Sequence, residues 1–73
     1  VYDNGGDGIL AGDGANVNGN TVTSNGGFGL SNFGSESVTY TDNVLTTNAT
    51  NVESHPSIFD RGGNACGTAA SCP

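Results

Sequence analysis

An internal repeat of 21 to 23 residues is the feature that most constrains how this chain can fold. The stretch VYDNGGDGI at residues 1–9 recurs as VTSNGGFGL at residues 22–30, with five identities and an Ile/Leu exchange at the last position. The stretch NTVTSN at residues 20–25 recurs as NVLTTN at residues 43–48, at an offset of 23. The apolar positions keep the same register, which a Gly- and Asn-rich composition alone does not produce. The sequence therefore predicts a chain of repeated structural units.

A unit of this length suits one turn of a solenoid, in which three short strands are joined by tight corners. We expect three columns of inward side chains shared by successive turns. These columns are Ile9 with Leu30, Val17 with Tyr40, and Val22 with Leu45. Threonines flank Val22 and Tyr40 on both sides, as expected for strands with one face in the core. We therefore predict an all-β fold with short parallel strands near residues 21–23, 28–31 and 38–41.

Asparagine recurs in register at two places in the unit. The first set is Asn4, Asn25 and Asn48, and the second is Asn20 and Asn43, with Asn64 as a further candidate. An asparagine tolerates the left-handed backbone conformation of a sharp bend, and its amide can bond to the same amide one turn away. The glycines at 5–6 and 26–27 are expected to take positive φ at these corners. Two asparagine ladders are the favoured interpretation, and solvated turn residues are the alternative.

Composition and charge exclude several classes of partner. Gly, Asn, Ser and Thr make up 38 of the 73 residues, a composition that would suit disorder if no repeat were present. The net charge is −6, and Arg61 is the only basic residue besides His55. One arginine cannot neutralise a row of phosphates or bind an anionic membrane surface. No apolar run approaches the roughly 18 residues of a membrane span. We expect no nucleic-acid partner and no membrane partner.

The repeat divides the chain into two parts. Residues 1–48 are predicted to form the coils, and residues 49–73 a final coil or C-terminal cap, because the repeat fades there. Pro56 cannot donate to a strand ladder. We expect Ile58 or Phe59 to fold over the last turn and cover the end of the core.

The two cysteines, Cys66 and Cys72, both lie in this last part. Their short spacing in an acidic, Thr- and Asn-rich chain predicts a disulfide formed in an oxidising compartment. We therefore expect a secreted or cell-surface protein. Two thiols with His55 do not complete a tetrahedral zinc site, so no metal site is predicted there.

The stretches NTVTSNGGFGL and VYDNGGDGIL resemble the repeats of right-handed parallel β-helix proteins, the pectin-lyase-like solenoids. The resemblance covers about two-thirds of the chain, and the ending GGNAC followed by SCP resembles the C-terminal tails of secreted bacterial members. It implies a right-handed parallel β-helix of two to three coils of 21–23 residues, plus an irregular C-terminal cap. The first turn begins within a unit, so we expect its open edge to self-associate or to stack on further coils.

That family includes polysaccharide lyases and hydrolases, tailspikes and adhesins, so the resemblance predicts a fold more than a function. Its hydrolases need two or three Asp side chains held close together. Asp3, Asp7 and Asp13 lie on the first unit here. The equivalent positions of the next unit hold Ser24, Phe28 and Gly34. We therefore predict no catalytic residue in this chain and a structural role as a stalk, spike or capping end.

Two alternatives stay open. The chain could be the end of a polysaccharide lyase or hydrolase whose active site lies in other coils, or a small glycan- or calcium-binding module. The run GGDGILAGDG at 5–14 resembles a calcium-binding nonapeptide, but its Asp residues stand at other positions and its period does not continue. Phe28, Phe33 and Tyr40 could stack on a polysaccharide, although an inward Tyr40 is the preferred interpretation. We expect no cofactor, with calcium as the open alternative.

Overall fold

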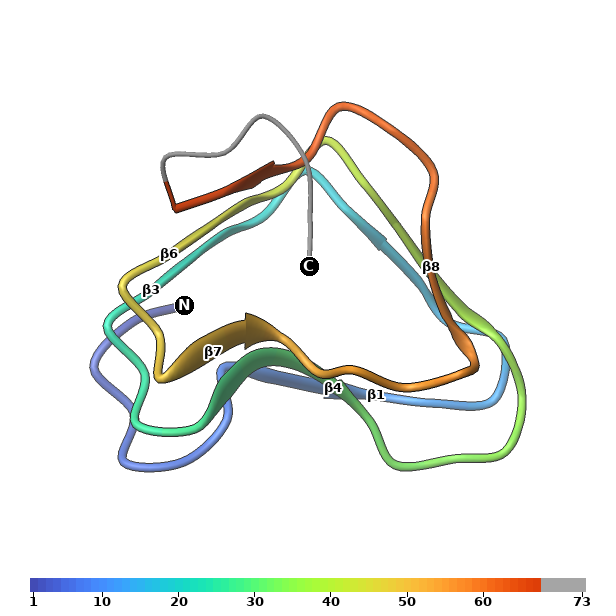
Figure 1. Ribbon diagram of the computed structural model, residues 1–73, viewed down its shortest axis with the longest axis horizontal. Helices are drawn as coiled ribbons and strands as arrows, with labels where there is room; N and C mark the ends of the chain where they lie inside the picture. Colours follow the sequence, from blue (N-terminus) through green and yellow to red (C-terminus); the bar gives the residue numbers. More distant parts are fainter. Residues whose placement is uncertain (68–73) are drawn as a thin grey trace.

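The computed structural model describes residues 1–67 as an all-β chain with no helix in that range. Nine strands of two to five residues form three parallel sheets (Figure 1). The strands are β1 Ile9–Ala11, β2 Asn16–Asn18, β3 Thr21–Thr23, β4 Phe28–Asn32, β5 Val38–Thr41, β6 Val44–Thr46, β7 Thr50–Val52, β8 Ile58–Asp60 and β9 Ala65–Cys66. The predicted strands near 21–23, 28–31 and 38–41 are confirmed.

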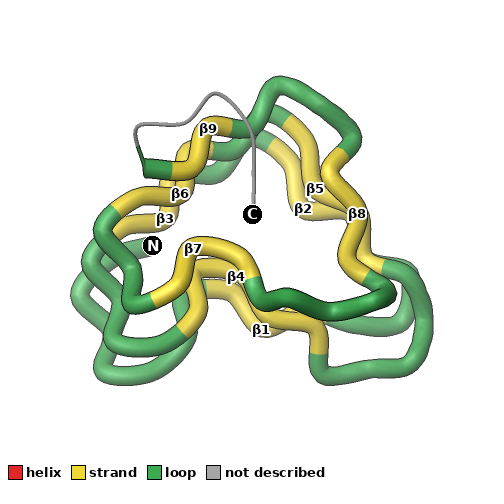
Figure 2. The backbone as a smooth tube through the Cα atoms, viewed as in Figure 1, coloured by secondary structure: helices red, strands yellow, loops and turns green. Residues whose placement is uncertain are grey.

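Successive strands belong to the three sheets in turn, so every third strand pairs with the one before it in the same sheet, and the chain forms a stack of turns. The strand orders are β1-β4-β7, β2-β5-β8 and β3-β6-β9, with every neighbouring pair parallel. We call β1–β3 the first turn, β4–β6 the second turn and β7–β9 the third turn. Seen along the stack, the turns outline a triangle with one sheet on each side (Figure 2). The molecule measures 27 × 25 × 18 Å, and the stack runs along the shortest dimension.

The register of the sheets matches the sequence repeat. Ile9 is the partner of Leu30, Val17 of Tyr40, and Val22 of Leu45. Parallel pairing of residues 21 to 23 positions apart, as the repeat predicts, is therefore confirmed between the first and second turns, whereas β5 and β8 pair at an offset of 20. Parallel strands need a crossover connection between them, and here the other two sides of the triangle provide it.

The core lies inside the triangle, where inward side chains of successive turns stack in columns along the axis. The buried apolar residues are Ala11, Val17, Val22, Leu30, Val38, Tyr40, Leu45, Val52 and Cys66. Leu30 and Val38 of the second turn are fully buried, whereas Ile9 of the first turn is only partly buried. A second-turn side chain has neighbours both above and below, so the middle of the stack is the best shielded.

The third turn continues the stack, and the expectation for this segment needs a correction. Ile58 and Phe59 form β8, which pairs with β5 on the wall of the triangle. From this wall Ile58 is partly buried and packs against the core, whereas Phe59 does not cover it. Phe59 is 44% exposed. Pro56 lies between β7 and β8, where no strand ladder needs its missing N–H. Backbone pairing with the second turn guides this segment although the side-chain repeat has faded.

Candidate functional site

The first asparagine ladder runs through one corner of the triangle. Asn25 Oδ1 accepts hydrogen bonds from Asn4 N at 3.2 Å and Asn4 Nδ2 at 2.9 Å. Asn48 Oδ1 accepts from Asn25 N at 3.1 Å and Asn25 Nδ2 at 2.8 Å. Asn51 ends the ladder within the third turn, because its Oδ1 accepts from Asn48 Nδ2 at 3.0 Å. The steps from Asn4 to Asn25 and from Asn25 to Asn48 each join two turns through one backbone and one side-chain N–H.

The second asparagine ladder has the same geometry at another corner and is more deeply buried. Asn43 Oδ1 accepts from Asn20 N and Nδ2 at 2.9 and 3.1 Å, and Asn64 Oδ1 accepts from Asn43 N and Nδ2, both at 2.9 Å. Asn43 and Asn64 are 1% and 2% exposed. The ladder ends where Asn64 Nδ2 donates to Asp60 Oδ1 at 2.8 Å. Asn64, only a candidate from the sequence, is therefore a full member.

The left-handed corners lie one residue earlier than the sequence suggests. The residues with positive φ directly before the first ladder are Asp3 at 58°, Ser24 at 59° and Thr47 at 60°. Those before the second ladder are Gly19 at 70°, Asp42 at 56° and Gly63 at 72°. The ladder asparagines themselves, and the glycines at 5–6 and 26–27, do not take positive φ. The preceding residue makes the bend, which leaves the asparagine N–H and amide aligned along the stack.

Glycine is required for close approach at Gly8 and Gly29, which stack next to the first ladder. A Cβ at Gly8 would lie 2.6 Å from Val22 Cγ1, and one at Gly29 would lie 2.5 Å from Asn51 O. No side chain larger than hydrogen can be placed there without moving the backbone of the turn. The spacing of Gly8 after Asn4, which recurs as Gly29 after Asn25, therefore reflects packing and not positive φ.

The ladders offset the free-energy cost of burying the asparagine side chains, because they supply hydrogen-bond partners. Each buried amide has partners, and no buried side-chain nitrogen or oxygen in residues 1–67 lacks a hydrogen bond. An amide at a fixed height on each turn also penalises any slip of register, because a shifted turn would leave it unpaired. The ladders therefore stabilise one stacking register.

The third corner is organised by residues that the repeat does not reveal. Asn32 is 4% exposed, and its Nδ2 donates to Glu36 O and Ser57 O, both at 3.1 Å. Glu53 Oε1 accepts from Ser31 Oγ at 2.8 Å and Asn32 N at 3.0 Å. The hydrogen bond from Ser31 is the main cause that lowers the pKa of Glu53. The sequence does contain a signal for this corner, because Asn32 lies in a strand and the carboxylate of Glu53 follows one repeat unit later.

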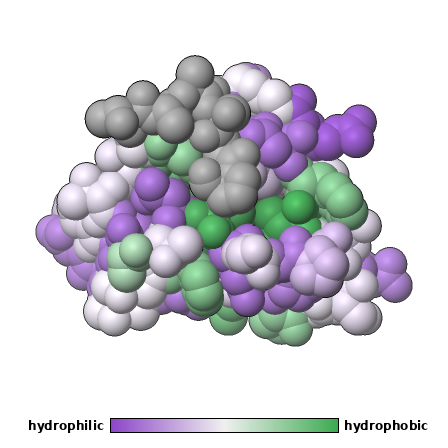
Figure 3. Space-filling model, viewed as in Figure 1, coloured by the Kyte–Doolittle hydropathy of each residue, from purple (hydrophilic) through white to green (hydrophobic). Residues whose placement is uncertain are grey.

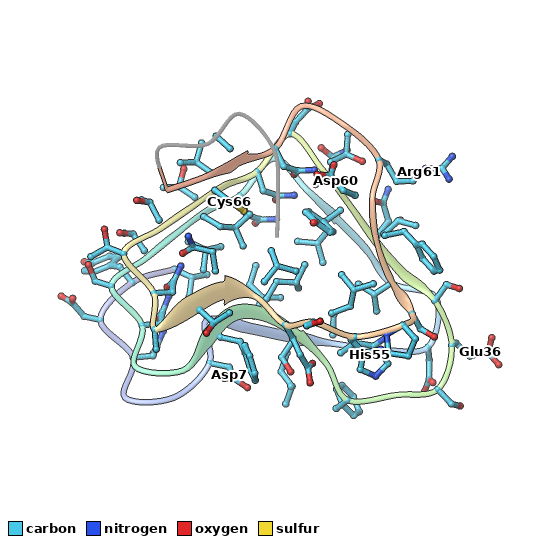
Figure 4. All side chains as sticks on the ribbon, viewed as in Figure 1. Asp7, Glu36, His55, Asp60, Arg61 and Cys66 are labelled. Atoms are coloured by element: carbon cyan, nitrogen blue, oxygen red, sulfur yellow. The ribbon has the colours of Figure 1, made fainter. Side chains whose placement is uncertain are left out.

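The titratable residues do not converge on one place. Asp7 Oδ1 accepts from Phe28 N at 2.8 Å and so links the first two turns, while His55 Nδ1 accepts from Ser57 N at 3.0 Å. Figure 4 shows Asp7, His55 and Arg61 well separated around the triangle. Over residues 1–67, no group of three His, Cys, Asp or Glu side chains that could hold a metal ion is found, and no pocket is found.

The three aromatic residues considered for stacking on sugars do not share a surface. Tyr40 is 2% exposed and belongs to the core. Phe28 is partly buried, whereas Phe33 is 68% exposed. The preferred interpretation of an inward Tyr40 is confirmed.

Cys66 is buried in β9, where it is the partner of Leu45. Cys72 lies outside the described residues, so the Cys66–Cys72 disulfide stays a prediction. Viewed from the third turn, strongly apolar side chains are visible near the centre of the molecule, and the rim is a mixture of polar and weakly apolar ones (Figure 3).

Within residues 1–67, no helix has the length and apolar character to cross a membrane. Comparison with models of protein families, with curated proteins and with solved structures gives no significant match.

Proposed function

We propose that this chain is a non-catalytic structural segment of a right-handed parallel β-helix, acting as a stalk, spike or capping end of a secreted or cell-surface protein. The observation that carries the proposal is the pair of asparagine ladders, which join all three turns along the stack. At the two ladder corners, the groups that join the turns are backbone N–H groups and side-chain amides. Such a stack is rigid along its axis because each turn is bonded to the next.

The right-handed sense of the helix is supported by a general rule for parallel strands. Crossover connections between parallel strands in one sheet are right-handed in about 98% of cases. In this chain every such connection passes over the other two sheets. A crystal structure of the chain tests this part of the proposal, and left-handed turns would contradict it.

Self-association through the first turn belongs to the same proposal. β1 and β2 are edge strands of their sheets. The Oδ1 atoms of Asn4 and Asn20 accept no hydrogen bond from residues 1–67, whereas every later ladder Oδ1 accepts two. Edge strands with unpaired groups are templates for pairing with another chain. The partner proposed is a second copy of this chain, joined at the β1 and β2 edges.

Sedimentation velocity over a range of concentrations tests the association. We expect dimers for the unaltered chain and fewer for Leu10→Lys, since lysine on an edge strand opposes pairing. Leu10 is 58% exposed on β1, so the change spares the core. Phe59→Lys is the matched control, because it adds the same charge to exposed β8 in the third turn. A chain that stays monomeric at all concentrations contradicts the self-association, as does equal weakening by both variants.

A further inference from the structure

The chain contains three Asn-Gly pairs, which differ in burial and in the hydrogen bonding of the glycine nitrogen. They are Asn4-Gly5, Asn18-Gly19 and Asn25-Gly26. In any Asn-Gly pair the glycine nitrogen can attack the side-chain carbonyl of the asparagine, because glycine offers no side chain to hinder the approach. The reaction requires a backbone that can move and a nitrogen not held in a hydrogen bond. These requirements can be compared site by site.

The pair Asn25-Gly26 is held at every reacting group. Asn25 is 3% exposed, and its Nδ2 and N both donate to Asn48. The attacking nitrogen, Gly26 N, donates to Asn4 O at 2.8 Å. Attack would break the ladder and a bond between turns at once.

The pair Asn18-Gly19 is exposed but its nitrogen is held. Asn18 is the last residue of β2, and Gly19 N donates to Thr41 O of the second turn at 3.1 Å. Gly19 also has a φ of 70°, fixed by the corner before Asn20. Attack would need β2 to separate from β5 at this end.

The pair Asn4-Gly5 alone of the three leaves its nitrogen open. Asn4, Gly5 and Gly6 are all exposed and lie outside the strands. Gly5 N has no hydrogen-bond acceptor among residues 1–67, although Asn4 O accepts from Gly26 N. A Cβ placed on Gly5 would meet no atom within 4 Å, so the segment also has room to move.

We propose that Asn4 is a site of spontaneous deamidation, set apart from Asn18 and Asn25 by the open nitrogen of Gly5. Deprotonated Gly5 N attacks Asn4 Cγ and forms a new C–N bond, and Nδ2 leaves as ammonia. Water then opens the five-membered imide. Attack at Cγ breaks the new bond and yields aspartate, while attack at the main-chain carbonyl breaks the original peptide bond and yields isoaspartate. The proposal does not depend on the structural role proposed above.

The product alters the end of the first ladder. Asn4 Nδ2 donates to Asn25 Oδ1 at 2.9 Å, and an aspartate has only oxygen acceptors at that place. Two acceptors then face each other, and the chain gains a negative charge in addition to its net −6. The side-chain bond of this ladder step is lost and only the backbone bond from Asn4 N can remain, so the first turn is less firmly bonded to the second.

The test is to incubate the whole 73-residue chain in mildly alkaline native buffer and in strong denaturant. Mass spectrometry of the intact chain with electron-based fragmentation then locates the small mass gain at each of the three sites. In denaturant the three pairs should react at similar rates. In native buffer Asn4 should stay within a few-fold of that rate, whereas Asn18 and Asn25 should slow many-fold.

The matched variant is Gly5→Ala, which fits without a clash and without left-handed strain. It should slow the reaction at Asn4 several-fold and leave the far-UV circular dichroism unchanged. Equal native rates at the three pairs would overturn the assignment, as would an Asn4 as slow as Asn25. An Asn4 rate that Gly5→Ala leaves unchanged would overturn the role of the Gly5 nitrogen.

Discussion

Asn43 Oδ1 lies 2.9 Å from the backbone nitrogen of Asn20 and 3.1 Å from its Nδ2, although the two residues are 23 positions apart. One oxygen thus receives two N–H groups from the turn before, and the next asparagine repeats the arrangement. Because Asn43 is 1% exposed, these bonds form away from water, where an unpaired group is most costly.

The first prediction concerns this ladder. Asn43→Ala should lower the free energy of unfolding by at least about 2 kcal/mol, because buried partners such as Val17 O and Asn64 Oδ1 lose their donor. Asn43→Asp keeps the accepting oxygen but not the donor, and should cost almost as much. Asn18→Ala, at an exposed position of β2, should change stability by less than about 0.5 kcal/mol. Urea unfolding followed by circular dichroism measures all three, and equal losses at 43 and 18 would contradict the ladder's role.

The second prediction concerns which way β3 faces. Val22 is fully buried, so Val22→Asn should cost on the order of 1–3 kcal/mol by burying an unpaired amide. Thr23 is the next residue and is partly exposed on the wall of the triangle, so Thr23→Asn should be nearly neutral. Thermal unfolding compares the pair. Equal tolerance of both changes would mean that β3 does not present Val22 to the core.

The third prediction concerns the corner before Asn48. Thr47 has a φ of 60°, which is strained for a β-branched side chain, whereas Asn occupies this region readily. Thr47→Asn should therefore raise the free energy of unfolding by about 1 kcal/mol. Ala49→Asn is the matched control, because Ala49 is exposed and does not have positive φ. If the control stabilises the chain as much as Thr47→Asn does, relief of backbone strain is not the cause.

The fourth prediction concerns alkaline pH. Burial, with the Asp60 carboxylate as the second cause, raises the pKa of Tyr40 from 10.0 to about 12. The fold thus favours the neutral phenol, so its contribution to stability is complete below pH 10 and is lost as pH rises toward 12. In a Tyr2→Phe background Tyr40 is the one remaining tyrosine, and its ultraviolet titration should follow the raised value. A pKa of 10.0 for Tyr40 in the folded chain would contradict the inward placement of its side chain.

Tyr40→Phe provides a second measurement for the same group. The variant should show a weaker loss of stability between pH 10 and 12 than the unaltered chain. Unfolding in urea at several pH values within that range compares the two.

The sequence by itself determined the parallel architecture and the columns of the core. Ile9 and Leu30, or Val22 and Leu45, stand one unit apart in the sequence and one strand apart in the sheets. The repeat predicts these contacts directly, because a stack of turns of equal length places equivalent positions of successive repeat units next to each other. The ladder asparagines follow for the same reason, since their spacing equals that of the columns.

Only the tertiary structure decided what depends on contacts between turns. The left-handed bend falls on Asp42 and not on Asn43, because the asparagine must align with the next turn. The third turn continues through Ile58 because pairing with Val38 outweighs the faded repeat. Asn51 ends the first ladder from a position outside its register. The first two outcomes rest on bonds between residues far apart in the chain, and the third on a local bond within one turn; a repeat of residue types encodes none of them.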